Sequence, residues 1–405
     1  MSHEPLIPPL DPPLDPNEPL LPGGTWTSVP NARCGVASGG IKPGSTRDDV
    51  VVLAARGTAA AVVTSSMAAA PPCYWTRKRV PGPCAGVVIN AGNANAATGP
   101  QGLKDAEAMA RAAAEVLGAP TDQVLVCSTG VIGVPMPMDR ALPAIRAAAK
   151  DLSASGQRAA EAILTTDLVV KQAAVRLGDI TVGGIGKGSG MIHPTMGTML
   201  AFVAVDAQVE PDALQRLTLA SAQRTFNQVS VDGDTSTNDT LIVQTTGQGP
   251  VIHEGSAEWD QLEHGIYSVT RHLAREIARD GEGATTLITV IVEGPSQHLA
   301  ELAARVVARS PLVKTAIHGR DPNWGRIAAA LGTIGYRPDA LDLDLAGFPV
   351  LRGGVPVAFD EATASAALTA PEVVIHARTR GTGIGRAWGC DLTADYVRIN
   401  ADYRS

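Results

Sequence analysis

The chain has 405 residues, a formal net charge of −7 and only 3% aromatic residues. This length allows one large domain or two lobes, and an acidic chain with few aromatic side chains lacks the basic, stacking surface that binds nucleic acid. No apolar run reaches the roughly 18–20 residues that cross a bilayer, so we expect neither a nucleic-acid nor a membrane partner.

Proline dominates residues 1–23, at Pro5, Pro8, Pro9, Pro12, Pro13, Pro16, Pro19 and Pro22. Such a composition favours an extended or disordered tail, and it lacks the basic region and apolar core of a secretory signal. The five cysteines are odd in number and irregularly spaced, as is typical of reduced thiols. We therefore expect a disordered tail over residues 1–23 and a cytoplasmic protein.

Beyond residue 24, short β-branched runs alternate with longer amphipathic ones. Strands are expected over residues 50–54, 60–64, 86–89, 123–127, 199–205, 241–245, 287–293 and 373–377. Helices are expected over residues 103–117, 211–226, 257–280 and 297–308. The alternation, which contains no internal repeat, predicts a mixed α/β fold.

A glycine-rich run ends at a threonine that precedes an apolar stretch. Residues 187–200 read KGSGMIHPTMGTML. In a tight turn, Thr198 can attack the carbonyl of Gly197, cleave the chain there and gain a free α-amine. An α-amine ordinarily titrates at roughly pH 7.7–8, so such a threonine is a nucleophile with a built-in base. On spacing alone, an ordinary turn before a buried strand remains the commoner explanation.

The same run resembles the self-cleavage site of the ornithine acetyltransferase (glutamate N-acetyltransferase) family. Further blocks resemble family signatures in the family's order, at residues 88–96, 128–133, 232–239, 321–327 and 387–405. The resemblance implies an ornithine acetyltransferase-like α/β fold of the N-terminal-nucleophile type, with stacked β-sheets flanked by helices. It also implies cleavage into an alpha chain (24–197) and a beta chain (198–405) that assemble as an alpha2-beta2 heterotetramer.

The resemblance assigns roles to particular residues. Thr198 is the nucleophile, Thr129 and Gly130 form the oxyanion hole, and Glu282 holds an ammonium or assists proton transfer. The positions that match substrate-binding residues of the family are Thr165, Thr166, Lys187, Thr198, Glu282, Asn400 and Ser405. Taken alone, Lys187 or Glu282 would more often be a solvated surface charge.

The implied reaction moves an acetyl group from N2-acetylornithine to glutamate through an acetyl-Thr198 intermediate, in arginine biosynthesis. It needs no cofactor, although some members also use acetyl-CoA as donor. No histidine spacing indicates a metal site. We expect His193 to be a structural turn residue.

The chain departs from the family pattern at several positions. Gly197 replaces the usual alanine, Thr195 replaces asparagine, and Gln228 stands where arginine is common. Residues 66–68 and 168–171 also differ. The last three departures could border the acceptor side of the site. They leave open a specialised paralogue that acetylates another amino acid, and an N-terminal-nucleophile amidohydrolase or aminopeptidase remains a second alternative.

Overall fold

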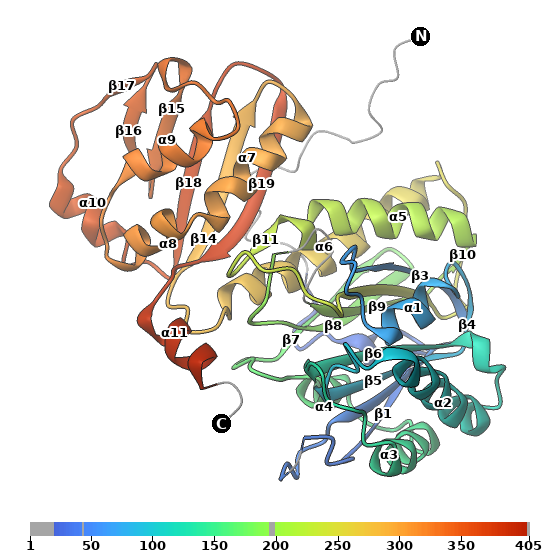
Figure 1. Cartoon of the computed structure of the whole chain (residues 1–405). Helices are drawn as coiled ribbons and strands as arrows, with labels where there is room; N and C mark the ends of the chain where they lie inside the picture. The colour runs from blue at the N-terminus through green and yellow to red at the C-terminus, as the bar shows by residue number, and fades with distance from the viewer. Residues whose placement is uncertain (1–19, 43, 194–198, 403–405) are drawn as a thin grey trace.

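The computed structural model describes residues 20–42, 44–193 and 199–402, so Gly197, Thr198 and Ser405 lie outside the described residues. The described chain alternates strands and helices, which confirms the mixed α/β fold (Figure 1). The strands are β1 (Arg33–Ala37), β2 (Val50–Ala54), β3 (Gly57–Val63), β4 (Gly82–Cys84), β5 (Gly86–Asn93), β6 (Val124–Val131), β7 (Lys171–Leu177), β8 (Ile180–Lys187), β9 (Leu200–Val205), β10 (Gln208–Val209), β11 (Val229–Ser230), β12 (Thr240–Thr245), β13 (Val251–Ile252), β14 (Leu287–Gly294), β15 (Asp342–Leu345), β16 (Phe348–Arg352), β17 (Val355–Pro356), β18 (Glu372–Arg378) and β19 (Gly383–Cys390).

The α-helices are α1 (Pro71–Arg77), α2 (Gly99–Leu117), α3 (Met138–Lys150), α4 (Gly156–Ala162), α5 (Pro211–Arg224), α6 (Ala257–Arg279), α7 (Gln297–Arg309), α8 (Pro311–His318), α9 (Trp324–Gly332), α10 (Glu361–Ala367) and α11 (Ala394–Ala401). Short 3-10 turns are η1 (Trp26–Ser28), η2 (Thr121–Gln123), η3 (Phe226–Gln228) and η4 (Pro338–Ala340).

Two sheets stack face to face in the larger body of the molecule. One has the strand order β1-β2-β5-β6, and the other has the order β4-β3-β12-β9-β8-β7. Their facing sides share one apolar core, to which Ile89 and Leu125 contribute from the first sheet and Phe202 and Ile242 from the second. The stacked sheets that the family resemblance implies are therefore confirmed.

Helices cover the two outer faces of this sandwich (Figure 1). Helices α2 and α3 pack their alanine-rich faces against Val88 and Val126 of the first sheet. Helices α5 and α6 pack against the outer face of the second sheet, where alternate residues such as Val203 and Val243 point away from the sandwich core. The period of two along each strand makes this division possible, because successive side chains face opposite sides of a sheet.

A third sheet forms a smaller body, drawn in orange at the upper left of Figure 1. Its strand order is β11-β19-β14-β18-β15-β16-β17, and α7, α8 and α9 pack on it around a separate apolar core. Trp388 and Cys390 at the end of β19 join the core beneath α6. This contact links the two bodies close to the turn that follows α6.

The boundaries of the expected elements agree with the observed ones to within four residues, but the expected elements do not include β7, β8, β19 or α3. Strand β6 continues to Val131 because Thr129 and Gly130 still pair with Ala91 and Gly92 of β5, so they lie within a strand and do not follow one. Helix α5 ends at Arg224, Thr225 connects the two elements, and the expected last residue, Phe226, begins the 3-10 turn η3.

The predicted cleavage point lies in the connection between two neighbouring strands. Lys187 at the end of β8 pairs with Leu200 at the start of β9. Strand β9 in turn pairs with β12, and β12 pairs with β3. In this six-stranded sheet, the two strands of the predicted beta chain, β12 and β9, therefore lie between two pairs of strands of the predicted alpha chain.

Residues 1–19 of the predicted proline-rich tail lie outside the described residues. Leu20 forms an isolated bridge to Val175 of β7, and the Leu21 N–H donates to the Ala174 carbonyl at 2.7 Å. No helix of the described residues has the length and apolar character needed to cross a bilayer.

Candidate active site

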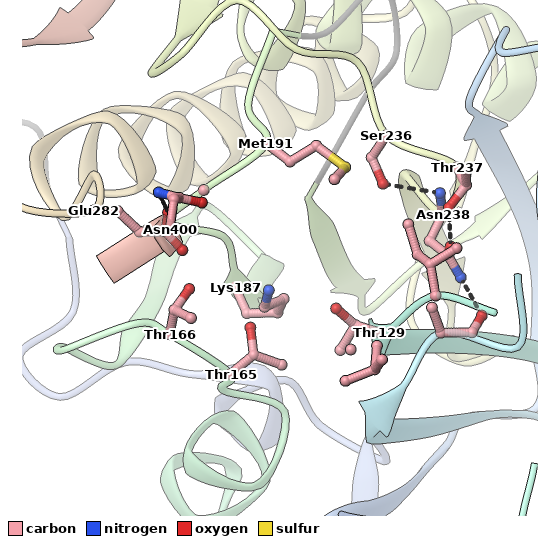
Figure 2. Close-up of a pocket in the computed structure, with 15 residues that line it drawn as sticks. Thr129, Thr165, Thr166, Lys187, Met191, Ser236, Thr237, Asn238, Glu282 and Asn400 are labelled. Carbon is pink, nitrogen blue, oxygen red and sulfur yellow. Dashed lines mark hydrogen bonds between the residues drawn. The ribbon is translucent and has the colours of Figure 1, made fainter. Parts of the chain in front are cut away.

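A cavity of about 250 Å³ opens where β6 and β8 end, between the two stacked sheets (Figure 2). It gathers seven of the predicted site residues, namely Thr129, Gly130, Thr165, Thr166, Lys187, Glu282 and Asn400. The remaining lining residues are Ala94, Val131, Ile132, Gly190, Met191, Ser236, Thr237 and Asn238. The predicted site residues Gly197, Thr198 and Ser405 are outside the described residues.

The predicted oxyanion hole lies at the end of β6. Gly130 has φ +133°, and a Cβ at this position would lie only 2.3 Å from the backbone carbon of Gly92. Only glycine fits there, because the backbone of β5 already occupies the space of a side chain. The strand end is further held by Asn238, whose Nδ2 donates to the carbonyl oxygen of Ser128 at 2.9 Å. Thr129 and Gly130 therefore have a fixed position at the edge of the cavity.

Lys187 is buried, with its Nζ 3.7 Å from Oδ2 of Asp167. Asp167 also accepts from Lys171 Nζ at 2.8 Å and from the Gly188 N–H at 2.6 Å. Burial on its own would raise the pKa of Asp167, but Lys187 and Lys171 hold it well below its usual range. The carboxylate is therefore ionised and stabilises a buried ammonium at the wall of the cavity. The alternative of a solvated surface lysine is wrong for Lys187.

A second carboxylate completes this ionic group. Asp280 Oδ2 accepts from Lys171 Nζ at 2.5 Å and from the backbone N–H of Leu168 at 3.0 Å. The Thr165 N–H in turn donates to Asp167 Oδ2 at 3.2 Å. These bonds shape the loop that carries Thr165 and Thr166 to the cavity. Neither aspartate has a role in the sequence-based predictions, although Asp167 directly follows the threonine pair.

Glu282 and Asn400 come together from distant parts of the chain (Figure 2). Asn400 Nδ2 in α11 donates to Glu282 Oε2 at 2.8 Å, and the Glu282 N–H donates to the Ser189 carbonyl at 3.0 Å. Thr393, the N-cap of α11, donates from Oγ1 to the Gly283 carbonyl at 2.7 Å. The last helix is thus fastened to the turn after α6. Glu282 is buried, so the alternative of a solvated surface charge is wrong here too.

The other side of the cavity is lined by Ser236, Thr237 and Asn238 (Figure 2). They belong to the block at residues 232–239, which resembles a family signature but has no role assigned to it in the sequence-based predictions. Gln228, in contrast, lines a different cavity, together with Arg224 and Arg305. Its departure from the family pattern therefore does not alter the wall of this site.

His193 lies just before the cleavage segment but does not line the cavity. It is buried, and its Nδ1 is 3.1 Å from Ser230 Oγ. Burial, followed by the charges of Arg305 and Arg309, lowers the pKa of His193 to about 4. The ring is therefore neutral near pH 7, as suits the structural role that we predict for it.

Among the described residues, no group of three or more histidine, cysteine, aspartate or glutamate side chains is placed to hold a metal ion. All five cysteines are buried and free. Burial raises the pKa of the Cys127 thiol well above its usual range, so this neighbour of the predicted oxyanion hole is a poor nucleophile.

The stacked sheets and their flanking helices define a layered α/β sandwich with a cavity at the ends of β6 and β8. The sequence pattern of the ArgJ family matches residues 33–405, and the chain belongs to this family. The family predicted from the sequence blocks is thereby confirmed.

Individual relatives agree. The arginine biosynthesis bifunctional protein ArgJ of Symbiobacterium thermophilum is 51% identical over 346 residues, which cover 82% of this chain and 86% of that protein. The protein of the same name from Thermosynechococcus vestitus is 47% identical over 355 residues, covering 81% and 84%. A crystal structure of ArgJ from Bacillus halodurans is 41% identical, with a TM-score of 0.48, and covers 49% of this chain and 96% of that one.

Proposed function

We propose that this ArgJ-family enzyme moves an acetyl group from N2-acetylornithine to glutamate, in arginine biosynthesis, through an acetyl ester on Thr198. The observation that carries the proposal is the convergence of four distant segments on one cavity. They supply the Thr129–Gly130 pair, the Lys187 ammonium, the Thr165–Thr166 loop and the Glu282–Asn400 pair. Thr198 stands two residues before Leu200, the residue of β9 that pairs with Lys187.

In the first half-reaction, Lys187 pairs with the donor's carboxylate and Glu282 accepts from the ammonium of the ornithine side chain. The Thr198 hydroxyl attacks the acetyl carbonyl, and its own α-amine takes the proton. The negative charge that develops on the carbonyl oxygen is met by the Thr129 hydroxyl and the Gly130 N–H. The C–N bond then breaks, and ornithine leaves with the transferred proton.

In the second half-reaction, glutamate enters the same cavity. Its amine attacks the acetyl ester, the C–O bond to Thr198 breaks, and the hydroxyl regains a proton. At about 250 Å³, the cavity is smaller than the roughly 300–1,000 Å³ of sites for drug-sized ligands, which favours one amino acid at a time. This supports a ping-pong order, and the chemistry requires no resident cofactor.

We further propose that the nucleophile arises by cleavage between Gly197 and Thr198. The two chains would stay together because they share one sheet, and pairs of them would form an alpha2-beta2 assembly. Five free, buried thiols support a cytoplasmic location, where cysteines stay reduced.

The test is to incubate the purified protein with N2-acetylornithine and, in separate reactions, glutamate or other amines. Acetylation of glutamate, lost in Thr198→Ala, is the expected result. Acetylation of a different amine alone would identify another transferase, and release of free acetate alone would identify a hydrolase. Either outcome would overturn the proposed reaction.

A further inference from the structure

One side chain joins the two backbone segments on either side of the predicted oxyanion hole. Asn238 is buried, and its Nδ2 donates to the carbonyl oxygens of Ser128 at 2.9 Å and of Ala94 at 2.6 Å. Ser128 directly precedes Thr129 in β6. Ala94 follows β5, and its N–H donates to the Val131 carbonyl at 3.0 Å. Asn238 therefore fixes the backbone both before and after the predicted oxyanion hole (Figure 2).

The pairing of β5 with β6 is irregular at this point. Asn93 of β5 lies opposite both Thr129 and Val131 of β6, so the register of the two strands is broken there. Such an irregularity disrupts the ladder of hydrogen bonds and changes the direction in which nearby groups point. The directions of the Thr129 hydroxyl and the Gly130 N–H therefore depend on contacts from outside the two strands. The two bonds from Asn238 are contacts of this kind.

The segment that carries Asn238 is itself held firmly. Each of the four carbonyl oxygens of residues 236–239 accepts a hydrogen bond, in chain order from Thr64 Oγ1 at 2.7 Å, the Ala70 N–H at 2.8 Å, Thr240 Oγ1 at 3.0 Å and the Thr64 N–H at 2.9 Å. Thr237 Oγ1 donates to Asn238 Oδ1 at 2.6 Å, which turns Nδ2 toward the two carbonyls. The amide donor thus has a fixed position and a fixed orientation.

These bonds also cross between the two predicted chains. Asn238 belongs to the predicted beta chain, whereas Ser128 and Ala94 belong to the predicted alpha chain. Asn238 lies two residues before Thr240, the first residue of β12. The predicted beta chain, which begins with the predicted nucleophile, therefore also holds the oxyanion hole that the alpha chain supplies.

We propose that Asn238 is a positioning residue for acyl transfer, whose amide holds the Thr129 hydroxyl and the Gly130 N–H in the directions that an oxyanion needs. Such donors stabilise a transition state only when they already point to the place where the charge develops. A small displacement of the donors therefore slows the reaction without weakening the binding of a ligand that forms no oxyanion. This inference rests on the proposed function, because it concerns the same oxyanion hole.

The test variant is Asn238→Asp, which keeps the size of the side chain but sets a carboxylate against two carbonyl oxygens. The matched control is Gln244→Glu, at the other end of β12. The Gln244 amide is also buried and donates to two backbone carbonyls, those of Ala55 and Cys84, but it does not line the cavity. Each enzyme is assayed for kcat with N2-acetylornithine and glutamate, for the Kd of ornithine by calorimetry, and for the free energy of unfolding.

Asn238→Asp should lower kcat by about 10- to 100-fold, since a displacement of about 1 Å in catalytic groups can cost about 10² in rate. The Kd of ornithine should stay within about twofold of the wild-type value, because ornithine lacks the acetyl carbonyl that the oxyanion hole binds. Gln244→Glu should lose a similar amount of stability, because it also leaves buried carbonyls without a donor, and keep kcat within about twofold of wild type.

The pH dependence separates positioning from a general loss of structure. Burial against two carbonyl oxygens raises the pKa of the introduced carboxyl, and its protonated form can again donate one hydrogen bond. The ratio of variant to wild-type kcat should therefore rise as the pH falls from about 8 to about 6. Lys187 and Glu282 line the same cavity, Asp239 follows Asn238, and Cys73 contacts the Thr237 carbonyl. All four are present in both enzymes, so the ratio reports on the introduced carboxyl.

Thr237→Val is a second, milder variant that decides the question if Asn238→Asp does not fold. It keeps the shape of the side chain and removes the hydroxyl that orients the Asn238 amide. We expect kcat to fall about three- to tenfold, roughly the worth of one hydrogen bond, with the Kd of ornithine unchanged.

A wild-type kcat in Asn238→Asp, or in Thr237→Val where the first variant does not fold, would overturn the inference. An equal loss of kcat in Gln244→Glu would also overturn it, because the rate would then follow stability alone. Failure of the proposed function gives a different result, in which the wild-type enzyme cannot acetylate glutamate from N2-acetylornithine.

Discussion

Asn400 Nδ2 donates a 2.8 Å hydrogen bond to Glu282 Oε2, joining the last helix of the chain to the turn after α6. The bond fixes one oxygen of the carboxylate that, in the proposed reaction, accepts from the substrate ammonium. The C-terminal helix is therefore part of the wall of the site.

Asn400→Ala should raise the KM for N2-acetylornithine about tenfold and change kcat less, because a bond to a charged group is lost and Glu282 becomes less well oriented. Steady-state kinetics measures both constants. Val397→Ala, an exposed position on the same helix, is the matched control and should behave as wild type. Unchanged kinetics in Asn400→Ala would show that α11 does not contribute to substrate binding.

Thr129→Ala should lower kcat by about 10²–10³, since it deletes one donor to the oxyanion, while the free energy of unfolding changes little. Thr129→Ser keeps the hydroxyl and should recover most of the activity. A Thr129→Ala enzyme with nearly wild-type kcat would show that the hydroxyl makes no contact with the reacting oxygen.

Gly130→Ala should destabilise the fold by several kcal/mol, because the added Cβ would meet the backbone of Gly92 at 2.3 Å in a positive-φ conformation. Gly133→Ala separates the two causes. Gly133 also has positive φ (+81°), but nothing lies within 4 Å of an added Cβ, so only backbone strain of about 1–2 kcal/mol is expected. Urea denaturation measures both values. Equal losses would mean that the contact with β5 is unimportant.

Asp167→Asn should cost about 3–5 kcal/mol at pH 7, because buried Lys187 loses the carboxylate that it contacts and buried Lys171 keeps only Asp280. The folded pKa of Asp167 lies below its unfolded value of about 3.9. Its stabilisation is therefore complete above that value and is lost as pH falls toward the folded pKa.

The gap in unfolding free energy between wild type and Asp167→Asn should thus be constant from about pH 6 to 8 and shrink below about pH 4. Asp179→Asn, in the exposed turn between β7 and β8, is the control and should show little change at any pH. A gap that grows on acidification would contradict the assigned ionisation state.

The hydrophobic patterns predicted several of the buried strands and four of the longer helices, because period-two and period-3.6 patterns persist where an element packs against the core. They did not indicate β7, β8, β19 or α3. The sequence did not predict that β6 extends to Val131, since hydrogen bonding to β5 and not local propensity holds Thr129 and Gly130 in the strand. The sequence also did not predict the strand order, because the pairing of β3 with β12 joins segments that are far apart in the chain.

For the site, motif resemblance led to seven residues that the fold gathers around one cavity. The sequence did not predict the buried ionic group of Asp167, Lys171 and Asp280, because each of these residue types is most often exposed to solvent. Their mutual contacts arise only when the loop before β7 meets the end of α6. Lys187 and Glu282 are likewise buried in the cavity wall, although residues of their types are most often exposed at the surface.

The most direct test of the central claim is intact mass spectrometry before and after brief mixing with N2-acetylornithine alone. We predict two fragments, 1–197 and 198–405, that co-purify and separate only in denaturant, with one acetyl group added to the second fragment at Thr198. Thr198→Ala should show neither cleavage nor labelling. A single full-length species, or two fragments that never carry an acetyl group while glutamate is still acetylated, would contradict an acetyl-Thr198 intermediate.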